Sequence, residues 1–382
     1  MLPSQRHLFD IPRDVTFFNA AAWSPLPKAT VDAAKSAVER KARPWLLDGA
    51  FAPGEYERCR RAAARLINAD PADVALISSV GYGVATAAKL FSPANGSRVI
   101  VLENDHTSPV LEWMSRADAQ GFTIETVRQP ADGDWTTAVL DAIARPGAAP
   151  LSLASISSIH WSDGGMLDID AIGAALKQAG AAFLIDATHG VGVIAMDVTR
   201  LDPDFVIWPT YKWLVGPYGR AFLYVAKRHQ DGVPLEQTAP GRRDVRAESA
   251  VYFADTRYLP DARRFDMGER DHFISMEMAS LGMELMSSLG AEAISGRLAM
   301  LTRKIAEGLA GLPVIFHAEQ LRAPHILSIG FRGGMPETLV SRLAAAKVYA
   351  APRLGRLRIS PHVYNDEEDV ARLISTLRAL IG

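Results

Sequence analysis

Two stretches decide the fold of this chain: Ala181-Ala-Phe-Leu-Ile-Asp186-Ala-Thr-His189-Gly190 and Asp204-Phe-Val-Ile-Trp-Pro-Thr-Tyr211-Lys212-Trp-Leu-Val-Gly216-Pro217-Tyr-Gly219. Each stretch begins with a short apolar run typical of a buried strand and ends in polar residues. The first strand ends in an Asp, and the second leads into a Lys that is followed by glycines. Because an apolar core does not tolerate unpaired polar groups, we expect these residues to carry chemistry.

Lys212 is the strongest candidate. A lysine in a loop is usually solvated, but Pro209, Trp213 and Leu214 surround this one with apolar bulk. Desolvation lowers the pKa of a lysine and makes its amine nucleophilic. Asp186 alone is as well explained as a helix cap or turn residue. Together, an amine that forms an imine and an acid that keeps a ring nitrogen protonated are what pyridoxal phosphate chemistry needs.

The surrounding sequence predicts an α/β fold. Apolar runs alternate with helical patterns, which indicates a mostly parallel sheet covered by helices on both faces. In such sheets ligands bind at the carboxyl ends of the strands, where Asp186 and Lys212 fall. The expected strands lie near residues 74–78, 98–102, 122–127, 151–156, 182–186, 205–208 and 221–225, and the expected helices between them near 84–91, 109–120, 136–144 and 169–179.

From Phe273 onward the pattern changes to long helices followed by short strands and a last helix from Asp366 to Leu380, which predicts a smaller α+β domain. We therefore expect a large domain over residues 15–260. Residues 1–14, as an N-terminal arm, and 261–382 form the expected second domain, because 382 residues exceed one ordinary core.

Two further segments carry candidate site residues. Gly81 and Tyr82 join a strand to a helix, and the N–H groups at a helix start bind phosphate. The spacing fits neither a dinucleotide fingerprint nor a Walker motif. His106 follows the next strand and either stacks on a cofactor ring or satisfies a turn. His189 is either a packed histidine or a hydrogen-bond partner of the cofactor.

The composition limits which other classes of protein and which partners fit this chain. Hydrophobic residues make up 48% and the formal net charge is -2, which favours neither a nucleic-acid nor a membrane partner. The single Cys59 excludes an intramolecular disulfide framework and a Cys-rich metal site, and no metal is expected. No signal peptide and no apolar run of roughly 20 residues is evident, so we expect a cytoplasmic protein.

These motifs make the chain similar to the class V aminotransferase family of fold-type I pyridoxal phosphate enzymes. That family includes cysteine desulfurases, kynureninase, isopenicillin N epimerase-like proteins and aminotransferases. The resemblance runs over nearly the whole chain. It rests on Phe18-Asn19-Ala-Ala, the Gly81-Tyr82 loop, His160-Trp-Ser162-Asp-Gly-Gly165, Asp186-Ala-Thr-His189-Gly-Val-Gly192, Tyr211-Lys212 and Arg358-Ile-Ser-Pro-His-Val-Tyr364-Asn365.

The resemblance implies a role for each matched residue. Lys212 would form the internal aldimine and move protons at Cα, Asp186 would bind the pyridine nitrogen, and Arg358 would clamp the substrate carboxylate with its guanidinium. The other implied contacts are ring stacking by His106, the phenolic oxygen by His189 and Ser162, the phosphate by Gly81, Tyr82 and Tyr211, a backbone contact from Gly268 to the partner subunit's phosphate, and substrate binding by Asn19. A homodimer with shared active sites and a small-molecule amino-acid substrate are also implied.

The reaction itself is less defined. Desulfurases carry a Cys on the loop that corresponds to residues 350–355, and no Cys stands there, which disfavours a persulfide-forming desulfurase. An aminotransferase is the leading prediction. The alternatives are an amino-acid epimerase or racemase and a C–S or β-eliminating lyase, since all begin at Cα. A catalytically silent protein that retains the fold is the non-enzyme alternative.

A local excess of arginine adds one hypothesis. Arg242, Arg243, Arg246, Arg263 and Arg264 form either a solvated surface or a second carboxylate site for a dicarboxylic or peptide-like substrate.

Overall fold

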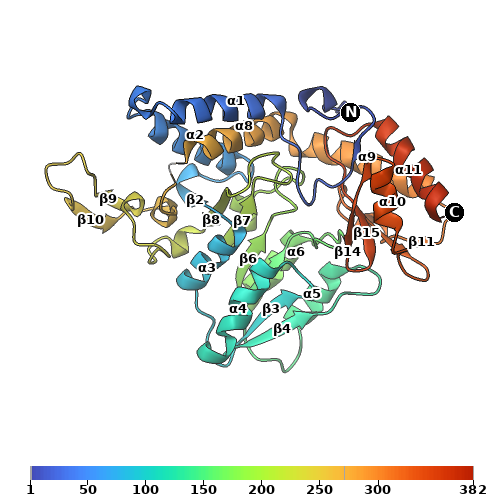
Figure 1. Ribbon diagram of the computed structural model, residues 1–382. Coiled ribbons are helices and arrows are strands. Elements are labelled where there is room, and N and C mark those ends of the chain that lie inside the picture. The colour runs from blue at the N-terminus through green and yellow to red at the C-terminus, as the bar shows by residue number, and fades with distance from the viewer. Residues whose placement is uncertain (1, 271, 382) are drawn as a thin grey trace.

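The computed structural model describes residues 2–270 and 272–381 and places a seven-stranded sheet at the centre of the protein (Figure 1). The strand β8 is antiparallel to both of its neighbours, β2 and β7, so the other six strands point the same way. Across the sheet the order is β2 (Val74–Ile77), β8 (Ala221–Val225), β7 (Phe205–Pro209), β6 (Ala182–Asp186), β5 (Leu151–Ser157), β3 (Arg98–Leu102) and β4 (Thr123–Val127).

Helices cover both faces of this sheet, which explains why its inner strands are continuous apolar runs. One buried cluster joins the sheet to α3 (Val80–Leu90) and α4 (Thr107–Gln120), through residues such as Val84 and Trp113. The other includes Trp135 of α5 (Trp135–Ile143) and Ile172 of α6 (Ile169–Ala179). A short helix, α7 (Val198–Leu201), precedes β7.

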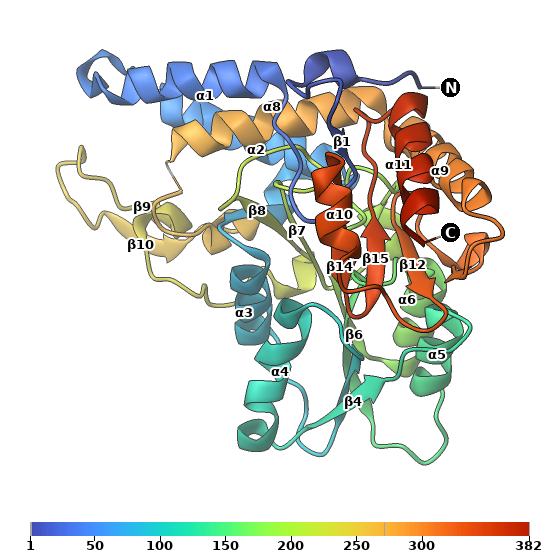
Figure 2. The ribbon, with the colours of Figure 1, turned by 45° about the vertical axis from the view of Figure 1, so that its right-hand side comes forward.

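Three long helices pack together beside the sheet. The helix α8 (Phe273–Leu289) lies along α1 (Lys28–Lys41) and α2 (Phe51–Arg65), as Figure 2 shows. Arg60 of α2 is fully buried and binds both carboxylate oxygens of Asp266, at 2.9 and 2.7 Å. Asp266 also accepts the backbone N–H of Leu76 at 2.8 Å, which ties α2 and β2 to the segment before α8.

The C-terminal part contains a second, four-stranded sheet. Its order is β11 (Val314–Ile315), β12 (Leu327–Phe331), β15 (Arg356–Ile359) and β14 (Ala351–Arg353), and its helices are α9 (Ala291–Gly308), α10 (Leu339–Ala345) and α11 (Glu367–Ile381). The N-terminal strand β1 (Thr16–Phe17) pairs in parallel with β13 (Val348–Tyr349), so the start of the chain joins this part. The division of the chain near residue 260 stays a prediction, and the expected ends at Met1 and Gly382 lie outside the described residues.

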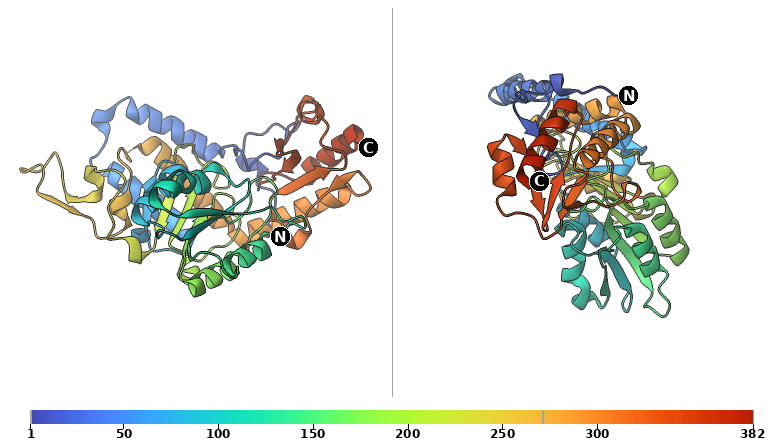
Figure 3. Two further views of the ribbon diagram at one scale, coloured as in Figure 1. Left: turned by 90° about the horizontal axis from the view of Figure 1, so that it is seen from below. Right: turned by 90° about the vertical axis from the view of Figure 1, so that its right-hand side faces the viewer.

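The structure contains two hairpins that the sequence pattern does not predict. One, formed by β9 (Arg242–Asp244) and β10 (Asp255–Tyr258), extends well away from the body of the protein (Figures 1 and 3). The other pairs β14 with β15 and turns at Leu354 and Gly355, both with positive φ. None of the helices formed by the described residues combines the length and apolar character that a membrane span requires.

Candidate functional site

The carboxyl ends of five parallel strands bring the candidate residues to one edge of the central sheet. Asp186 is the last residue of β6, and Lys212 follows β7 after a two-residue turn. His106 follows β3, Ser79 follows β2, and Ser157 ends β5. This edge is where parallel sheets bind ligands, so the position expected for Asp186 and Lys212 agrees with the observed topology.

Lys212 is buried at this edge. Its side chain is 7% exposed, and its Nζ lies 3.2 Å from Nε2 of His189. Burial, with a further contribution from the guanidinium of Arg358, lowers the pKa of Lys212 to about 7. A fraction of the side chain is therefore a neutral amine near pH 7, the form that attacks an aldehyde or accepts a proton.

His189 is held from both ends by the surrounding residues. Its Nδ1 accepts the indole N–H of Trp213 at 3.1 Å, and its backbone oxygen accepts Nε2–H of His325 at 2.7 Å. Burial and the charge of Lys212 lower the pKa of His189 well below its ordinary value. The ring is therefore neutral and fixed in orientation beside the lysine.

A cavity of about 250 Å³ opens on one side of Lys212. The start of α3 forms part of its wall, because Ser79, Val80 and Gly81 line it, and the Ser79 side chain caps that helix by accepting the N–H of Tyr82 at 3.1 Å. His106 and Tyr211 complete the wall beside Lys212. The N–H groups of Val80 and Gly81, the first two residues of this helix, are not engaged by the Ser79 cap, and such N–H groups at a helix start suit a phosphate.

A second cavity of about 340 Å³ shares Lys212, His106 and Tyr211 with the first and contains Arg358. Arg358 is 1% exposed, and its Nη1 donates to the backbone oxygen of Trp161 at 2.6 Å. Its Nε and Nη2 have no hydrogen-bond partner among the described residues. Burial, and secondly the charge of Arg353, lower the pKa of Arg358 to about 9. Two unpartnered N–H groups on one buried guanidinium fit a carboxylate.

The two cavities together fit pyridoxal phosphate. The buried Lys212 amine is available for a Schiff base, the start of α3 faces the smaller cavity, and Asp186 ends the strand beside it. The hydroxyl of Thr188, which lines the same cavity, is buried and has no hydrogen-bond partner among residues 2–270 and 272–381. A bound cofactor would satisfy such an orphaned group.

Six of the expected site residues line neither cavity. Two of them are Asp186, at the end of β6, and His189, whose Nε2 lies 3.2 Å from Nζ of Lys212. The Ser162 hydroxyl turns to Nδ1 of His160 at 3.2 Å, and the half-buried side chain of Tyr82 lies near Glu236. The backbone N–H of Gly268 donates to the carboxylate of Glu236 at 2.5 Å. Asn19 forms a turn with its backbone, and its buried side-chain oxygen has no partner among the described residues.

Sequence reasoning missed three residues of this site. Trp213 follows Lys212 in the chain, and Asp105 precedes His106. Because both neighbours were expected in the site, these positions in the sequence were the available signal. Arg353 lines the larger cavity from the unpredicted hairpin of β14 and β15, and the correspondence of residues 350–355 to the cysteine loop of desulfurases was the available signal.

The arginine cluster lies elsewhere within the chain. Arg242 and Arg243 belong to the projecting hairpin, where Arg242 lies 3.9 Å from the centre of the Tyr258 ring. Arg246 pairs with Asp244 at 2.7 Å, and Arg263 pairs with Glu57 at 2.9 Å. Arg264 donates to the backbone oxygens of Leu259 and Gly232. None of these five arginines lines either cavity beside Lys212.

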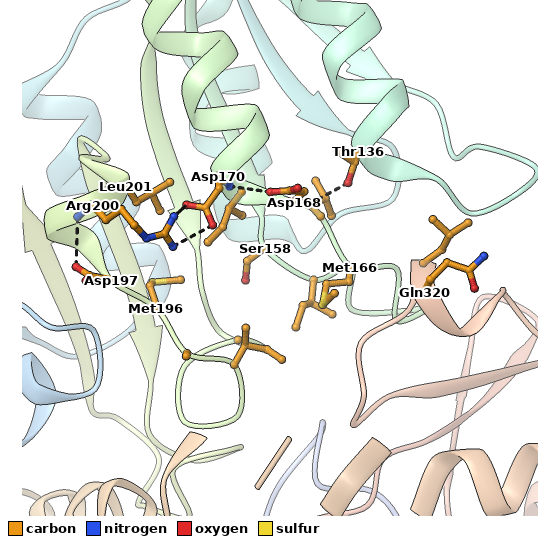
Figure 4. A pocket seen from close by; sticks show the side chains of 17 residues that line it. Thr136, Ser158, Met166, Asp168, Asp170, Met196, Asp197, Arg200, Leu201 and Gln320 are labelled. Carbon is orange, nitrogen blue, oxygen red and sulfur yellow. Dashed lines mark hydrogen bonds and ion pairs between the residues drawn. The ribbon is translucent and has the colours of Figure 1, made fainter. Parts of the chain in front are cut away.

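A third cavity, of about 330 Å³, includes Gly190, which follows His189 in the chain, among its lining residues. Figure 4 shows the side chains that line it. Its walls are largely apolar and include Met166, Met196 and Leu201, and the ion pair of Arg200 with Asp170 lies beside them. It contains no lysine or histidine and none of the expected site residues. Its remaining acidic residues, Asp168 and Asp197, accept backbone N–H groups as the caps of α6 and α7.

Comparison with known proteins places this geometry in a family. The family model for aminotransferase class-V matches residues 16–373. An uncharacterized aminotransferase, YcbU, of Bacillus subtilis is 26% identical over 85% of this chain and 83% of its own length. A probable cysteine desulfurase of Pyrococcus abyssi is 25% identical over 97% of this chain and 96% of its own length.

A solved structure supports the same fold. A variant of C-DES with glycine covalently linked to its PLP cofactor superposes with a TM-score of 0.86 at 19% identity, over 99% of this chain and 100% of that chain. The expected fold class is thereby confirmed, and the family match confirms the expected cofactor. The chain belongs to the class-V aminotransferase family of pyridoxal-phosphate-dependent enzymes.

Proposed function

We propose that this protein is an aminotransferase that acts at Cα of an amino acid, with pyridoxal phosphate held on Lys212. One observation carries the proposal: Lys212 and Arg358 line the same cavity, and Nε and Nη2 of that arginine have no hydrogen-bond partner among the described residues. When bound, the cofactor supplies an electron sink for the bonds at Cα. The residues of the chain then have to bind the carboxylate and move one proton.

Each residue has a distinct task in this proposal. Arg358 binds the substrate carboxylate through Nε and Nη2, which sets the direction of the amino acid in the cavity. The pKa of Lys212 is lowered to about 7, so its neutral amine takes the proton from Cα and then donates it to an atom other than Cα. Asp186 holds the ring nitrogen protonated, and His189 donates to the phenolic oxygen from the neighbouring loop.

The position of the one cysteine speaks against persulfide chemistry in this proposal. Cys59, the single cysteine of the chain, lies in α2 and is fully buried. Burial raises the pKa of its thiol to about 11, so almost no thiolate forms near neutral pH. Cys59 lines neither cavity beside Lys212, and the desulfurase-like loop over residues 350–355 presents an arginine instead of a thiol.

Product analysis tests the reaction type. The purified protein, loaded with pyridoxal phosphate, is incubated with single amino acids, with and without a second 2-oxo acid. The proposal predicts a new 2-oxo acid that accumulates only when the second 2-oxo acid is present. Inverted amino acid with exchange of the Cα hydrogen, or released sulfide or ammonia with no acceptor present, would contradict transamination and identify an epimerase or a lyase.

We also propose a homodimer in which each subunit completes the site of the other, with the backbone near Gly268 reaching the partner's phosphate. The projecting hairpin supports this, because Val251, Tyr252 and Phe253 at its tip are 62%, 52% and 64% exposed. An aromatic tip of this kind gains stability when it is buried in an interface. Sedimentation should give twice the chain mass, and a fully active monomer would contradict the proposal.

A further inference from the structure

Arg353 and Arg358 lie on the same face of one hairpin. The strands β14 and β15 are antiparallel, with Ala351 opposite Arg358 and Arg353 opposite Arg356. Opposite residues share a face of the sheet, as do alternate residues of one strand, so Arg353 and Arg358 share a face. Arg353 is displaced by two residues along the hairpin, which is about 7 Å. Both arginines line the larger cavity beside Lys212.

Arg353 has no carboxylate partner in the part of the chain that the structure describes. Its Nη1 donates to the backbone oxygen of Pro352 at 2.7 Å, and its guanidinium lies 5.9 Å from the centre of the Trp161 ring. Its charge lowers the pKa of both Arg358 and Lys212, which shows that the three cations act on one another. Arg353 is half-buried, so water screens only part of the repulsion among the three cations, and a ligand that supplies negative charge would relieve the rest.

Asp105, the acidic residue that lines this cavity, forms its hydrogen bonds with Ser157 and His106 and none with Arg353 or Arg358. Its Oδ1 accepts the Ser157 hydroxyl at 2.6 Å and the N–H of His106 at 2.7 Å. Its Oδ2 accepts the backbone N–H of Ser157 at 3.0 Å. A monocarboxylic amino acid brings one carboxylate, which the free N–H groups of Arg358 bind. Arg353 then still lacks an anionic partner.

We propose that Arg353 binds a second anionic group of the substrate, and that the substrate is a dicarboxylic amino acid. Arg358 takes the carboxylate at Cα, and Arg353, farther along the hairpin, takes the side-chain carboxylate. The inference rests on the proposed function and names the substrate class of that site. It also moves the proposed second carboxylate site from the arginine cluster of residues 242–264 to a residue of the cavity itself.

Binding of unreactive acids tests this assignment without turnover. Succinate and glutarate are compared with butyrate and valerate, which lack the second carboxylate, by calorimetry on the full-length, cofactor-loaded protein. We expect the dicarboxylates to bind at least about tenfold more tightly, as a charge-assisted hydrogen-bonded pair implies. Arg353→Gln should abolish this preference, and Arg332→Gln, at an exposed position, should keep it.

A spectroscopic control separates failure of this assignment from failure of the proposed function. Reaction of the bound cofactor with neutral and acidic amino acids is followed by its visible absorption. If amino acids react but dicarboxylates show no preference, or the preference survives in Arg353→Gln, the assignment is overturned and the function stands. If no amino acid changes the absorption, the proposed function fails whatever the succinate affinity.

Discussion

The indole N–H of Trp213 donates to Nδ1 of His189 at 3.1 Å, while Nε2 of His189 lies 3.2 Å from Lys212. An indole N–H can only donate, so Nδ1 of His189 carries no proton and the neutral ring carries its proton on Nε2. Trp213 is thus a positioning residue that fixes His189 as a hydrogen-bond donor toward Lys212 and the cofactor.

Trp213→Phe should release this tautomer. Without the indole donor, Nδ1 can take up a proton, so we expect a mixture of neutral tautomers and a higher pKa for His189. Nitrogen NMR of the ¹⁵N-histidine-labelled protein measures both, with the signal assigned by its loss in His189→Gln. Trp208→Phe is the matched control, because the buried Nε1 of Trp208 has no partner among the described residues. An unchanged His189 signal in Trp213→Phe would refute the role.

Cofactor loading should report the lowered pKa of Lys212. The neutral amine is the nucleophile, so the rate at which cofactor-free protein takes up pyridoxal phosphate should rise with pH through about 7 and level off above it. An unperturbed lysine would give a midpoint near 10.4. Because the charge of Arg358 helps to lower this pKa, Arg358→Gln should move the midpoint upward. Stopped-flow absorbance over a pH series provides the measurement.

Loss of Arg358 should weaken substrate recognition far more than cofactor binding. Its side chain lines the cavity that contains Lys212 but not the smaller cavity beside the start of α3. Losing a charge-assisted pair costs about 1.5–3 kcal/mol, so Arg358→Gln should lower kcat/KM by about 10–100-fold. Arg358→Lys should recover part of this, since an ammonium cannot bind both oxygens in the same way. If Arg358→Gln weakened the binding of pyridoxal phosphate as much as it lowered kcat/KM, the result would argue against Arg358 as the residue that binds the substrate carboxylate.

The buried ion pair of Arg60 and Asp266 should dominate local stability. Both side chains are fully buried, and Asp266 also caps the N–H of Leu76. Asp266→Asn removes the fully buried partner of Arg60 and leaves only the part-exposed Glu57, at 3.0 Å from Nε; breaking a buried pair costs about 3–5 kcal/mol. Urea denaturation should show this loss, whereas Asp366→Asn, which removes a partner of the exposed Arg13, should change stability far less. If Asp266→Asn and Asp366→Asn lowered the free energy of unfolding by the same amount, the buried pair would not have this role.

Much of the central sheet could be predicted from the sequence. The strands β3, β6 and β8 begin and end at the expected residues, because each is a short apolar run between clear breaks. The positions of Asp186 and Lys212 followed from the rule that parallel sheets bind ligands at their carboxyl ends. The antiparallel direction of β8 could not be read from the sequence, since a fully buried strand has the same pattern in either direction.

The substrate side of the site was harder to predict. The strand β14 has only three residues, Ala351–Arg353, and includes a proline, so it shows no strand periodicity. Strand periodicity therefore gave no sign that Arg353 lines the cavity beside Lys212. Ser162 was expected at the cofactor, but its hydroxyl lies near His160 instead, a contact set by a loop whose course depends on tertiary packing.

The central claim, that Lys212 carries the cofactor, is tested most directly by trapping the Schiff base. The yellow, cofactor-loaded protein is reduced with borohydride, digested and analysed by mass spectrometry. The account predicts a pyridoxyl phosphate adduct on Lys212 and no visible absorption band in Lys212→Ala. An adduct on a different lysine, or a protein that remains colourless with excess pyridoxal phosphate, would contradict it.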